Sequence, residues 1–395
     1  MKYVKLNTLC DINIGKTPSR SKQEYWGSGR KWISIADIKS TYITDTKEQI
    51  TSLGIDQSKI KLVPKDTVIM SFKLTVGKVA ITAEDMYTNE AIASFPIKDN
   101  SKLYTKYLYY CLQTLNLMSA TDRAVMGATL NKAKLNEIKI PYVDYDQQIK
   151  IANILDQAQE LIDKRKVQIE ALNELIQSVF YDMFGDLRIN PHGYKVLKLS
   201  QLVSEKSDIV DGPFGSSVNT KTDYIEDGEI PVIRTKNVKM LDFSVEDLKF
   251  MTREKYETVK RSQVLPGDII LTKVGTIGNV CIFPNIYPEA VLSTTGSCRI
   301  RVNNNVVNPK YLVIYLMLYK PVLLEIASTG VQSFLNMNHV KNIDILLPDK
   351  EKQNLYVQKV SNIVKQKELL NESLVELENN FNSLMQRAFN GEPLC

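Results

Sequence analysis

The triplet Gly15-Lys16-Thr17 has the residue types that close a phosphate-binding loop of ATPases. In such a loop, a glycine five residues before the triplet allows backbone N–H groups to surround the phosphates. Cys10 occupies that position, and Pro18 disfavours a helix beginning at Thr17. The spacing therefore argues against an ATP site, although this basic, turn-rich segment could meet phosphate in another way.

Other signatures of catalysis are missing. No G-x-S-x-G occurs, and no Rossmann glycine fingerprint follows a strand pattern. Pro348-Asp349 could open a nuclease motif, but no Asp/Glu-x-Lys follows it. The proline-rich tetrapeptide with which adenine methyltransferases grip a flipped base is also missing. We therefore expect a binding protein with no catalytic residue and no cofactor of its own.

The cysteines and histidines predict no metal site. The five cysteines are an odd number without a C-x-x-C pair, and His192 and His339 lack metal-ligand spacing. This cysteine usage favours a reducing cytosol, and no secretory segment follows Met1. The longest apolar run, from Tyr311 to Tyr319, is too short to cross a bilayer. We expect a cytoplasmic protein with no membrane partner.

Charge is unevenly distributed along the chain. The net charge is +5, but residues 1–144 contain 21 Lys and Arg against 14 Asp and Glu. The first part of the chain is therefore basic. That excess permits a nucleic-acid partner without requiring one.

An internal repeat organises the sequence. The segment 63–81 matches 265–282: each has a Pro-x-Asp turn, an apolar strand, a Thr-Val/Ile-Gly turn and a second apolar strand. The tripeptide "KYL" occurs at 106–108 and again at 310–312, each time in an apolar helical pattern predicted over about 103–118 and 309–327. Gly127 corresponds to Gly330. The repeat predicts two similar globular parts.

After each globular part, apolar residues recur at alternating intervals of four and three positions over a long segment, here called a ladder. Adding 205 to the residue numbers of the first ladder gives those of the second. A 3.5-residue period sustained for this length indicates a coiled-coil seam. Gly185 and Gly391 stand where each helix should end. The predicted seam residues are Ile151, Leu155, Ile162, Arg165, Ile169, Leu172 and Ile176 in the first helix, and Val360, Ile363, Lys367, Leu370, Leu374, Leu377 and Phe381 in the second.

Each seam contains one cation, Arg165 or Lys367. Its stem could pack while the charge reaches water, or the charge could make a polar contact that sets the helix register.

The expected fold class is α+β, with two similar mixed α/β domains separated by two long antiparallel coiled-coil helices and a pseudo-two-fold internal repeat. The expected boundaries are 1–144 and 188–349 for the domains, and 145–187 and 350–391 for the helices. The first ladder spans 32 residue steps, or about 48 Å of helix. Domains held that far apart could read two sites on one face of a DNA duplex.

The chain resembles the specificity subunit of type I restriction-modification systems along essentially its whole length. The first half carries "GKTPSRSKQEYWGSGRKWISIADI" (15–38), "MGATLNKAKLNEIKIP" (126–141) and "QQIKIANILD" (147–156). The second half carries "DGPFGSS" (211–217) and "FLNMNHVKNIDILLP" (334–348). Each piece alone is weakly diagnostic, but their order, repeated and each time followed by a long helix, is specific.

The resemblance implies that the two globular parts are target-recognition domains, each reading half of a split DNA sequence. It also implies two methyltransferase subunits that bring S-adenosylmethionine, and restriction/translocase subunits that use ATP and Mg. These cofactors would all lie on partner subunits. The second half lacks the "TPS…YW" run of the first, so we expect the domains to read different half-sites.

The candidate DNA contacts are loop hydroxyls and cations, which suit phosphate oxygens, together with arginines that could pair with guanine edges. They are Lys16, Thr17, Ser19, Arg20, Lys22, Tyr25, Arg30, Lys39, Lys73, Asn131 and Lys132 in the first domain, and Ser216, Lys221, Arg234, Lys236, Asn237, Lys273 and Asn336 in the second.

Structural explanations compete with DNA contact for several of these residues. Tyr25 could pack in the core, as we expect for Trp32. Lys73 and Lys273 could belong to turns. Asn131 and Asn336 could cap the short helices that follow them.

Two other functions remain to be tested against DNA reading. A coiled-coil assembly protein that binds only proteins would have no affinity for duplex DNA. A self-contained methyltransferase or nuclease would show activity as a purified chain.

Overall fold

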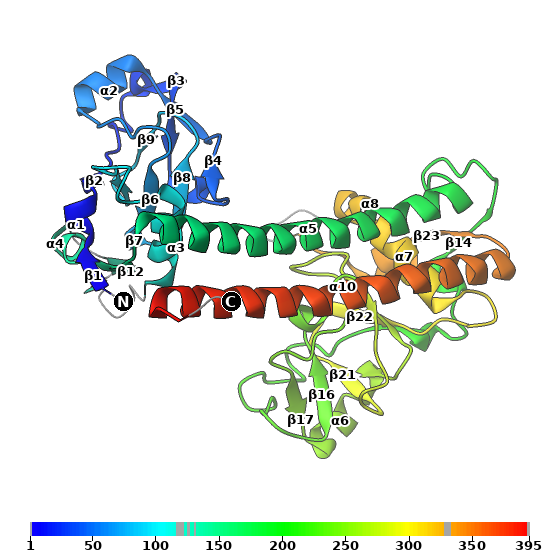
Figure 1. The fold of residues 1–395 in the computed structure, drawn as a ribbon. Coiled ribbons are helices and arrows are strands. Elements are labelled where there is room, and N and C mark those ends of the chain that lie inside the picture. Colours follow the sequence, from blue (N-terminus) through cyan, green and yellow to red (C-terminus); the bar gives the residue numbers. More distant parts are fainter. Residues whose placement is uncertain (1, 116–121, 125–126, 130–131, 328–332, 393–395) are drawn as a thin grey trace. The chain divides into compact units, whose positions relative to one another are not determined.

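The computed structural model describes residues 2–115, 122–124, 127–129, 132–327 and 333–392. These residues form two compact units, Met1–Val167 with Asn371–Cys395, and Gln168–Leu370. Each unit consists of one mixed α/β domain together with one part of each long helix (Figure 1). The predicted contact Asn131 and the repeat residue Gly330 lie outside the described residues.

The domain of the first unit is built on a five-stranded sheet of order β2-β10-β6-β8-β4 and a three-stranded sheet of order β5-β3-β9. Their strands are β2 (Asn13–Ile14), β10 (Ile92–Phe95), β6 (Val68–Ser71), β8 (Val79–Thr82), β4 (Tyr42–Ile43), β5 (Glu48–Ile50), β3 (Trp26–Ile33) and β9 (Tyr87–Thr88). Smaller sheets pair β1 (Lys2–Lys5) with β13 (Lys139–Tyr142), and join β11 (Asp122–Ala124), β12 (Gly127–Thr129) and β7 (Lys73–Leu74). Every residue of β6 and β8 is buried, as continuous apolar strands should be.

The domain of the second unit has sheets of order β15-β22-β19-β20 and β17-β16-β21-β18, and a β14-β23 pair. The strands are β14 (Lys195–Lys198), β15 (Ile209–Asp211), β16 (Ile230–Ile233), β17 (Lys249–Met251), β18 (Gln263–Val264), β19 (Ile269–Thr272), β20 (Val280–Ile282), β21 (Ala290–Leu292), β22 (Ser297–Ile300) and β23 (Asp344–Leu347).

The two domains repeat the same strand pairing. The order β2-β10-β6-β8 corresponds to β15-β22-β19-β20, and β5-β3-β9 corresponds to β17-β16-β21. In each three-strand set the middle strand pairs antiparallel with one neighbour and parallel with the other. Unit 1 adds β4 and unit 2 adds β18. The structure thus confirms the internal repeat predicted from the sequence.

Short helices complete the domains: α1 (Leu6–Leu9), α2 (Ser52–Ser58), α3 (Thr105–Thr114) and α4 (Lys132–Asn136) in the first, and α6 (Arg253–Thr258), α7 (Pro309–Leu318), α8 (Lys320–Ile326) and α9 (Met337–Lys341) in the second. The prediction of one helix over 309–327 was wrong, because the segment is divided into α7 and α8. Pro321 lies in the first turn of α8. Its ring lacks an N–H and clashes with the carbonyl four residues earlier, so α7 cannot continue through it.

The two long helices are α5 (Tyr145–Phe184) and α10 (Lys350–Asn390). Gly185 and Gly391 follow their last residues with φ of +76° and +82°. Such left-handed residues end helices, and glycine adopts this conformation at little cost. The predicted stop positions are therefore confirmed.

Both units join the two helices through apolar side chains. In the first, Leu155 of α5 shares a core with Met385 and Phe389 of α10. In the second, Ile176 of α5 shares a core with Val360 of α10. The start of α5 thus packs with the end of α10, and the end of α5 with the start of α10, so the helices run antiparallel. All the predicted seam residues are buried or half-buried, including Arg165 and Lys367.

A buried glutamine attaches each long helix to its domain. The Gln148 amide donates to the carbonyls of Lys102 and Val143 at 2.9 and 3.0 Å. Its oxygen accepts from the Tyr104 N–H at 2.9 Å. The first turn of α5 is thereby tied to the segment that leads into α3.

Gln353 does the same in the second unit. Its amide donates to the Pro348 carbonyl and its oxygen accepts from the Asn308 N–H, both at 2.8 Å. Gln148 and Gln353 are fully or almost fully buried and differ by the same 205 positions as the helix ladders.

Candidate nucleic-acid interface

The segment that begins at Gly15 is a loop packed against the sheet of the first domain, not a phosphate loop. The N–H of Gly15 donates to Ile92, and that of Lys16 donates to Thr88 at 2.9 Å. A Cβ at Gly15 would come within 2.2 Å of the Thr88 carbonyl oxygen, so the position requires glycine. The glycine of the Gly-Lys-Thr triplet therefore serves close backbone packing.

Arg20 has both an acidic and an aromatic partner within the first domain. Its guanidinium pairs bidentately with Glu48, with Nη2 to Oε2 at 2.9 Å, and lies 3.8 Å above the Trp26 ring. The hydrogen bonds from Arg20 lower the pKa of Glu48. The Arg20 side chain remains 54% exposed, so it can reach a ligand if it leaves Glu48.

Most of the remaining predicted contacts of the first domain are exposed, and some of them also have partners within the domain. Lys16, Ser19, Lys22, Arg30, Lys39 and Lys132 are exposed. Thr17 donates to Glu90, and Lys73 lies 5.4 Å from the Phe72 ring.

The prediction that Tyr25 contacts DNA was wrong. Its side chain is only 7% exposed, and Gly54 of α2 packs against it. The core alternative is therefore right for Tyr25, and the core expectation for Trp32 is confirmed because Trp32 is 1% exposed.

Two further predicted contacts, in the second domain, are buried and need correction. Lys273 is 3% exposed and its Nζ lies 3.4 Å from Asp211, because a buried cation requires a nearby anion. Asn237 is fully buried; its oxygen accepts from the Arg234 N–H, and its amide donates to two loop carbonyls. Both side chains are engaged within the domain and neither reaches the surface.

Asn336 caps a helix, which was the structural explanation weighed against DNA contact. Its side chain caps α9 by accepting from the His339 N–H at 2.8 Å. Ser216 and Lys221 are exposed on the loop after β15. These two residues remain predictions of DNA contact.

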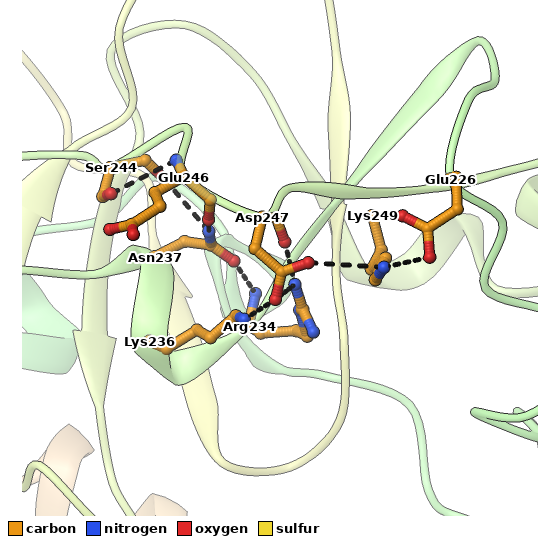
Figure 2. A network of polar contacts seen from close by, with 8 residues as sticks. All are labelled: Glu226, Arg234, Lys236, Asn237, Ser244, Glu246, Asp247 and Lys249. Carbon is orange, nitrogen blue, oxygen red and sulfur yellow. Dashed lines mark hydrogen bonds and ion pairs between the residues drawn. The ribbon is translucent and has the colours of Figure 1, made fainter. Parts of the chain in front are cut away.

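Arg234 and Lys236 belong to a charged group that the sequence did not reveal as a unit, here called the cation cluster: Arg234, Lys236 and Lys249, gathered around Asp247 (Figure 2). Arg234 Nη2 and Lys249 Nζ each lie 3.3 Å from the Asp247 carboxylate, and Lys236 also pairs with it. Glu226 pairs with Lys249 from the other side.

Strand pairing assembles the cation cluster. β16 and β17 are antiparallel, and Val232 lies opposite Lys249. Arg234 follows the end of β16, so it stands beside the start of β17. Sequence reasoning missed Asp247 and Lys249 because they are 13 and 15 residues from Arg234 and belong to no recognised motif.

The same place in the first domain has different chemistry. The 3-10 helices Ile35–Asp37 and Thr235–Asn237 are equivalent. In both, the side chain of the last helical residue accepts a hydrogen bond from the backbone N–H of the residue just before the helix. Ser34 and Ala36 therefore correspond to Arg234 and Lys236. Glu48 lies opposite Trp32 as Lys249 lies opposite Val232. Three cations in the second domain are thus replaced by a hydroxyl, a methyl group and a carboxylate.

Neither a metal site nor a membrane span is found in the part of the chain that the structure describes. Its His, Cys, Asp and Glu side chains form no group of three or more that could hold a metal ion. No helix of the same residues is long and apolar enough to cross a membrane.

Two domains with the same strand pairing and two long antiparallel helices characterise this chain. A family model described as "Type I restriction modification DNA specificity domain" matches residues 1–173 and 203–379. The chain belongs to this family, whose function is the recognition of DNA sequence.

Known relatives cover most of the chain. The specificity subunit of the type I restriction enzyme MjaIX from Methanocaldococcus jannaschii is 24% identical over 369 residues, which are 87% of this chain and 82% of that protein. The specificity subunit of the EcoBI enzyme from Escherichia coli is 23% identical over 337 residues, covering 78% and 70% of the two chains.

Solved structures share the fold at 15% sequence identity. The S subunit of a type I restriction-modification system from M. genitalium has a TM-score of 0.54 and covers 98% of this chain and 96% of its own. A chain from a study of complex assembly and conformational transition of the type I R-M system has a TM-score of 0.61, with 98% and 97% covered. These similarities confirm the fold class predicted from the sequence.

Proposed function

We propose that this chain recognises a two-part DNA sequence, with one half read by each domain. One observation carries the proposal: the domains repeat the same strand pairing but present different side chains at equivalent positions. The same scaffold can then dock on DNA in the same way twice while contacting different bases. Sequence is read by contacts to base edges, whereas phosphate contacts position the protein.

We further propose that the chain is a non-catalytic subunit that assembles two methyltransferase subunits and restriction/translocase subunits in the cytoplasm. In this assembly, the partners hold S-adenosylmethionine, ATP and Mg. The long helices support a protein-docking role because they expose large apolar side chains. Leu355 and Leu369 of α10 are 48% and 57% exposed, and they are two heptads apart on one helix face.

Binding of the full chain to duplex DNA at increasing salt tests the proposal. We expect binding at low salt that weakens steeply between about 50 and 200 mM, because bound phosphates release counterions. Single-stranded DNA of the same length is the control, since a reader of duplex grooves prefers the duplex.

Two results would contradict the proposal. Absence of duplex binding at low salt would favour a scaffold that binds only proteins. Methylation or cleavage of DNA by the purified chain alone would show a self-contained enzyme.

A further inference from the structure

The cation cluster of the second domain contains more positive than negative charge. Arg234, Lys236 and Lys249 share the single carboxylate of Asp247. Among the described residues, Glu226 also pairs with Lys249, but it is 84% exposed, so water screens that pair strongly. Glu246 acts on Lys236 electrostatically, and no direct ion pair joins these two described residues (Figure 2).

The cations are held close together before any ligand arrives. The side chains of Arg234 and Lys249 are only 23% and 20% exposed. Arg234 also donates to the main-chain carbonyl of Asp247, so its position does not depend on the carboxylate alone. Two of the three cations are therefore held within the domain, and Lys236, at 47% exposed, is the most accessible of the three.

The cluster has unused capacity for an anion. The pKa of Lys236 is lowered by desolvation first, and then by repulsion from Arg234 and Lys249. The Arg234 Nε is buried and has no hydrogen-bond partner among the described residues. Additional negative charge at this place would relieve the repulsion and could satisfy a donor.

The Asp247 carboxylate resembles a DNA phosphodiester in its charge and in its hydrogen-bond acceptors. Each carries one negative charge on two accepting oxygens, which suit a guanidinium and ammonium groups. Asp247 is also 47% exposed, so the place it occupies is open to solvent and to a ligand of similar charge.

We propose that the Arg234–Lys236–Lys249 cluster is a phosphate-binding site for the DNA backbone, and that Asp247 occupies it when DNA is absent. A backbone phosphate displaces the Asp247 carboxylate, and the three cations change partner. This inference rests on the proposed function and assigns a backbone-positioning contact to the second domain. The first domain has no equivalent, because Ser34, Ala36 and Glu48 stand at the corresponding positions.

The substitution Asp247→Asn tests the displacement. Asp247 has φ of +50°, a left-handed conformation that asparagine also tolerates, so the turn should be retained. We expect Asp247→Asn to raise the affinity of the full chain for a duplex of random sequence about threefold to tenfold, since the phosphate no longer competes with a carboxylate. Fluorescence anisotropy with a labelled duplex over a salt series measures this change.

Substitution of the lysines should lower the affinity for DNA. Lys236→Gln should weaken binding and reduce the slope of log K against log salt by about one, as expected when one phosphate contact is lost. In a chain that carries Lys236→Gln and Lys249→Gln together, Asp247→Asn should give no gain. This pair of backgrounds isolates the coupling between the carboxylate and the cations.

Glu257→Gln is the matched control. This substitution removes the exposed carboxylate of Glu257 on α6, which pairs with Lys260 at 2.9 Å. It changes the net charge by the same amount as Asp247→Asn. We expect its effect on affinity to stay within about twofold, since the ion pair of Glu257 is with Lys260 rather than with a member of the cation cluster, and salt screens exposed charges.

The inference is overturned if Asp247→Asn changes affinity no more than Glu257→Gln, or if it lowers affinity because the cluster only stabilises the fold. It is also overturned if the gain persists without the lysines. Failure of the proposed function looks different, because the unsubstituted chain would then show no salt-dependent duplex binding.

Discussion

At the scale of single residues, the aromatic group around Phe180 holds the second domain to the long helices. The Phe180 ring centroid lies 4.9 Å from that of Phe184 and 5.3 Å from that of Tyr356 on α10. It also stacks on Tyr311 of α7, with centroids 5.9 Å apart. Phe180 is fully buried, so it joins three helices of the second unit at one point.

Phe180→Ala should therefore destabilise the second unit by about 3–5 kcal/mol, the usual cost of removing a buried phenyl ring and leaving a cavity. Urea unfolding of the full chain measures the loss. Leu175→Ala is the control, because Leu175 lies on the same helix and is 44% exposed. A similar loss in both variants would show that the aromatic group does not join the helices as described.

Glu289 gives the second domain a pH-dependent stability. Hydrogen bonds from Arg253, and then from Tyr256, lower its pKa from 4.5 to about 2, against the opposing effect of burial. A carboxyl whose pKa is lower in the folded state stabilises the fold above its unfolded pKa and loses that contribution as pH falls toward its folded pKa.

We expect the melting temperature of the unsubstituted chain to fall between about pH 4.5 and pH 2 by more than that of Glu289→Gln, because only the former loses this contribution. Thermal melts across the window measure the difference. Glu254→Gln, on the exposed surface of α6, controls for the loss of one charge. Parallel curves for the unsubstituted chain and Glu289→Gln would contradict the assignment.

Residue types alone predicted surface contacts less well than they predicted helices. Lys273 and Asn237 have the chemistry of DNA contacts, but both are engaged inside the domain. Lys273 pairs with Asp211, 62 residues away in sequence, and Asn237 donates to the carbonyls of Ser244 and Glu246 in the loop that follows it. Tyr25 was drawn into the core by α2, which follows it by more than 25 residues. A linear pattern does not contain these long-range partners, so it could not separate buried from exposed polar groups.

At the scale of elements, the apolar periodicity of the sequence was sufficient to predict the long helices, because that periodicity depends only on residues a few positions apart. The ladders predicted α5 and α10 and their ends at Gly185 and Gly391, since helical faces and stop signals depend on near neighbours in sequence. The cation cluster could not be predicted in this way. It depends on the register between β16 and β17, which places Lys249 opposite Val232.

The buried glutamines give an element-scale prediction. Gln148→Ala and Gln353→Ala should each destabilise the chain by about 1–3 kcal/mol, because buried backbone groups lose their partners. Gln147→Ala, an exposed neighbour, should have little effect. Urea unfolding compares the three variants, and equal stability of Gln148→Ala and Gln147→Ala would show that this attachment is unimportant.

At the scale of the whole molecule, duplication explains how one chain carries two readers. The repeated strand order retains the scaffold, and different side chains at equivalent positions give each domain its own chemistry. Ser34 and Arg234 show this most clearly, since both precede an equivalent 3-10 helix but differ in charge and reach. We expect the same division in function, with each half of the DNA sequence depending on one domain.

The most direct test of this account is to map the adenines methylated when the chain is combined with the proposed methyltransferase subunits, before and after residues 190–349 are replaced by those of a relative. We predict a two-part methylated sequence with a fixed gap, in which the replacement changes one part and leaves the other intact. A single uninterrupted sequence, or a change in both parts, would contradict the two-reader account.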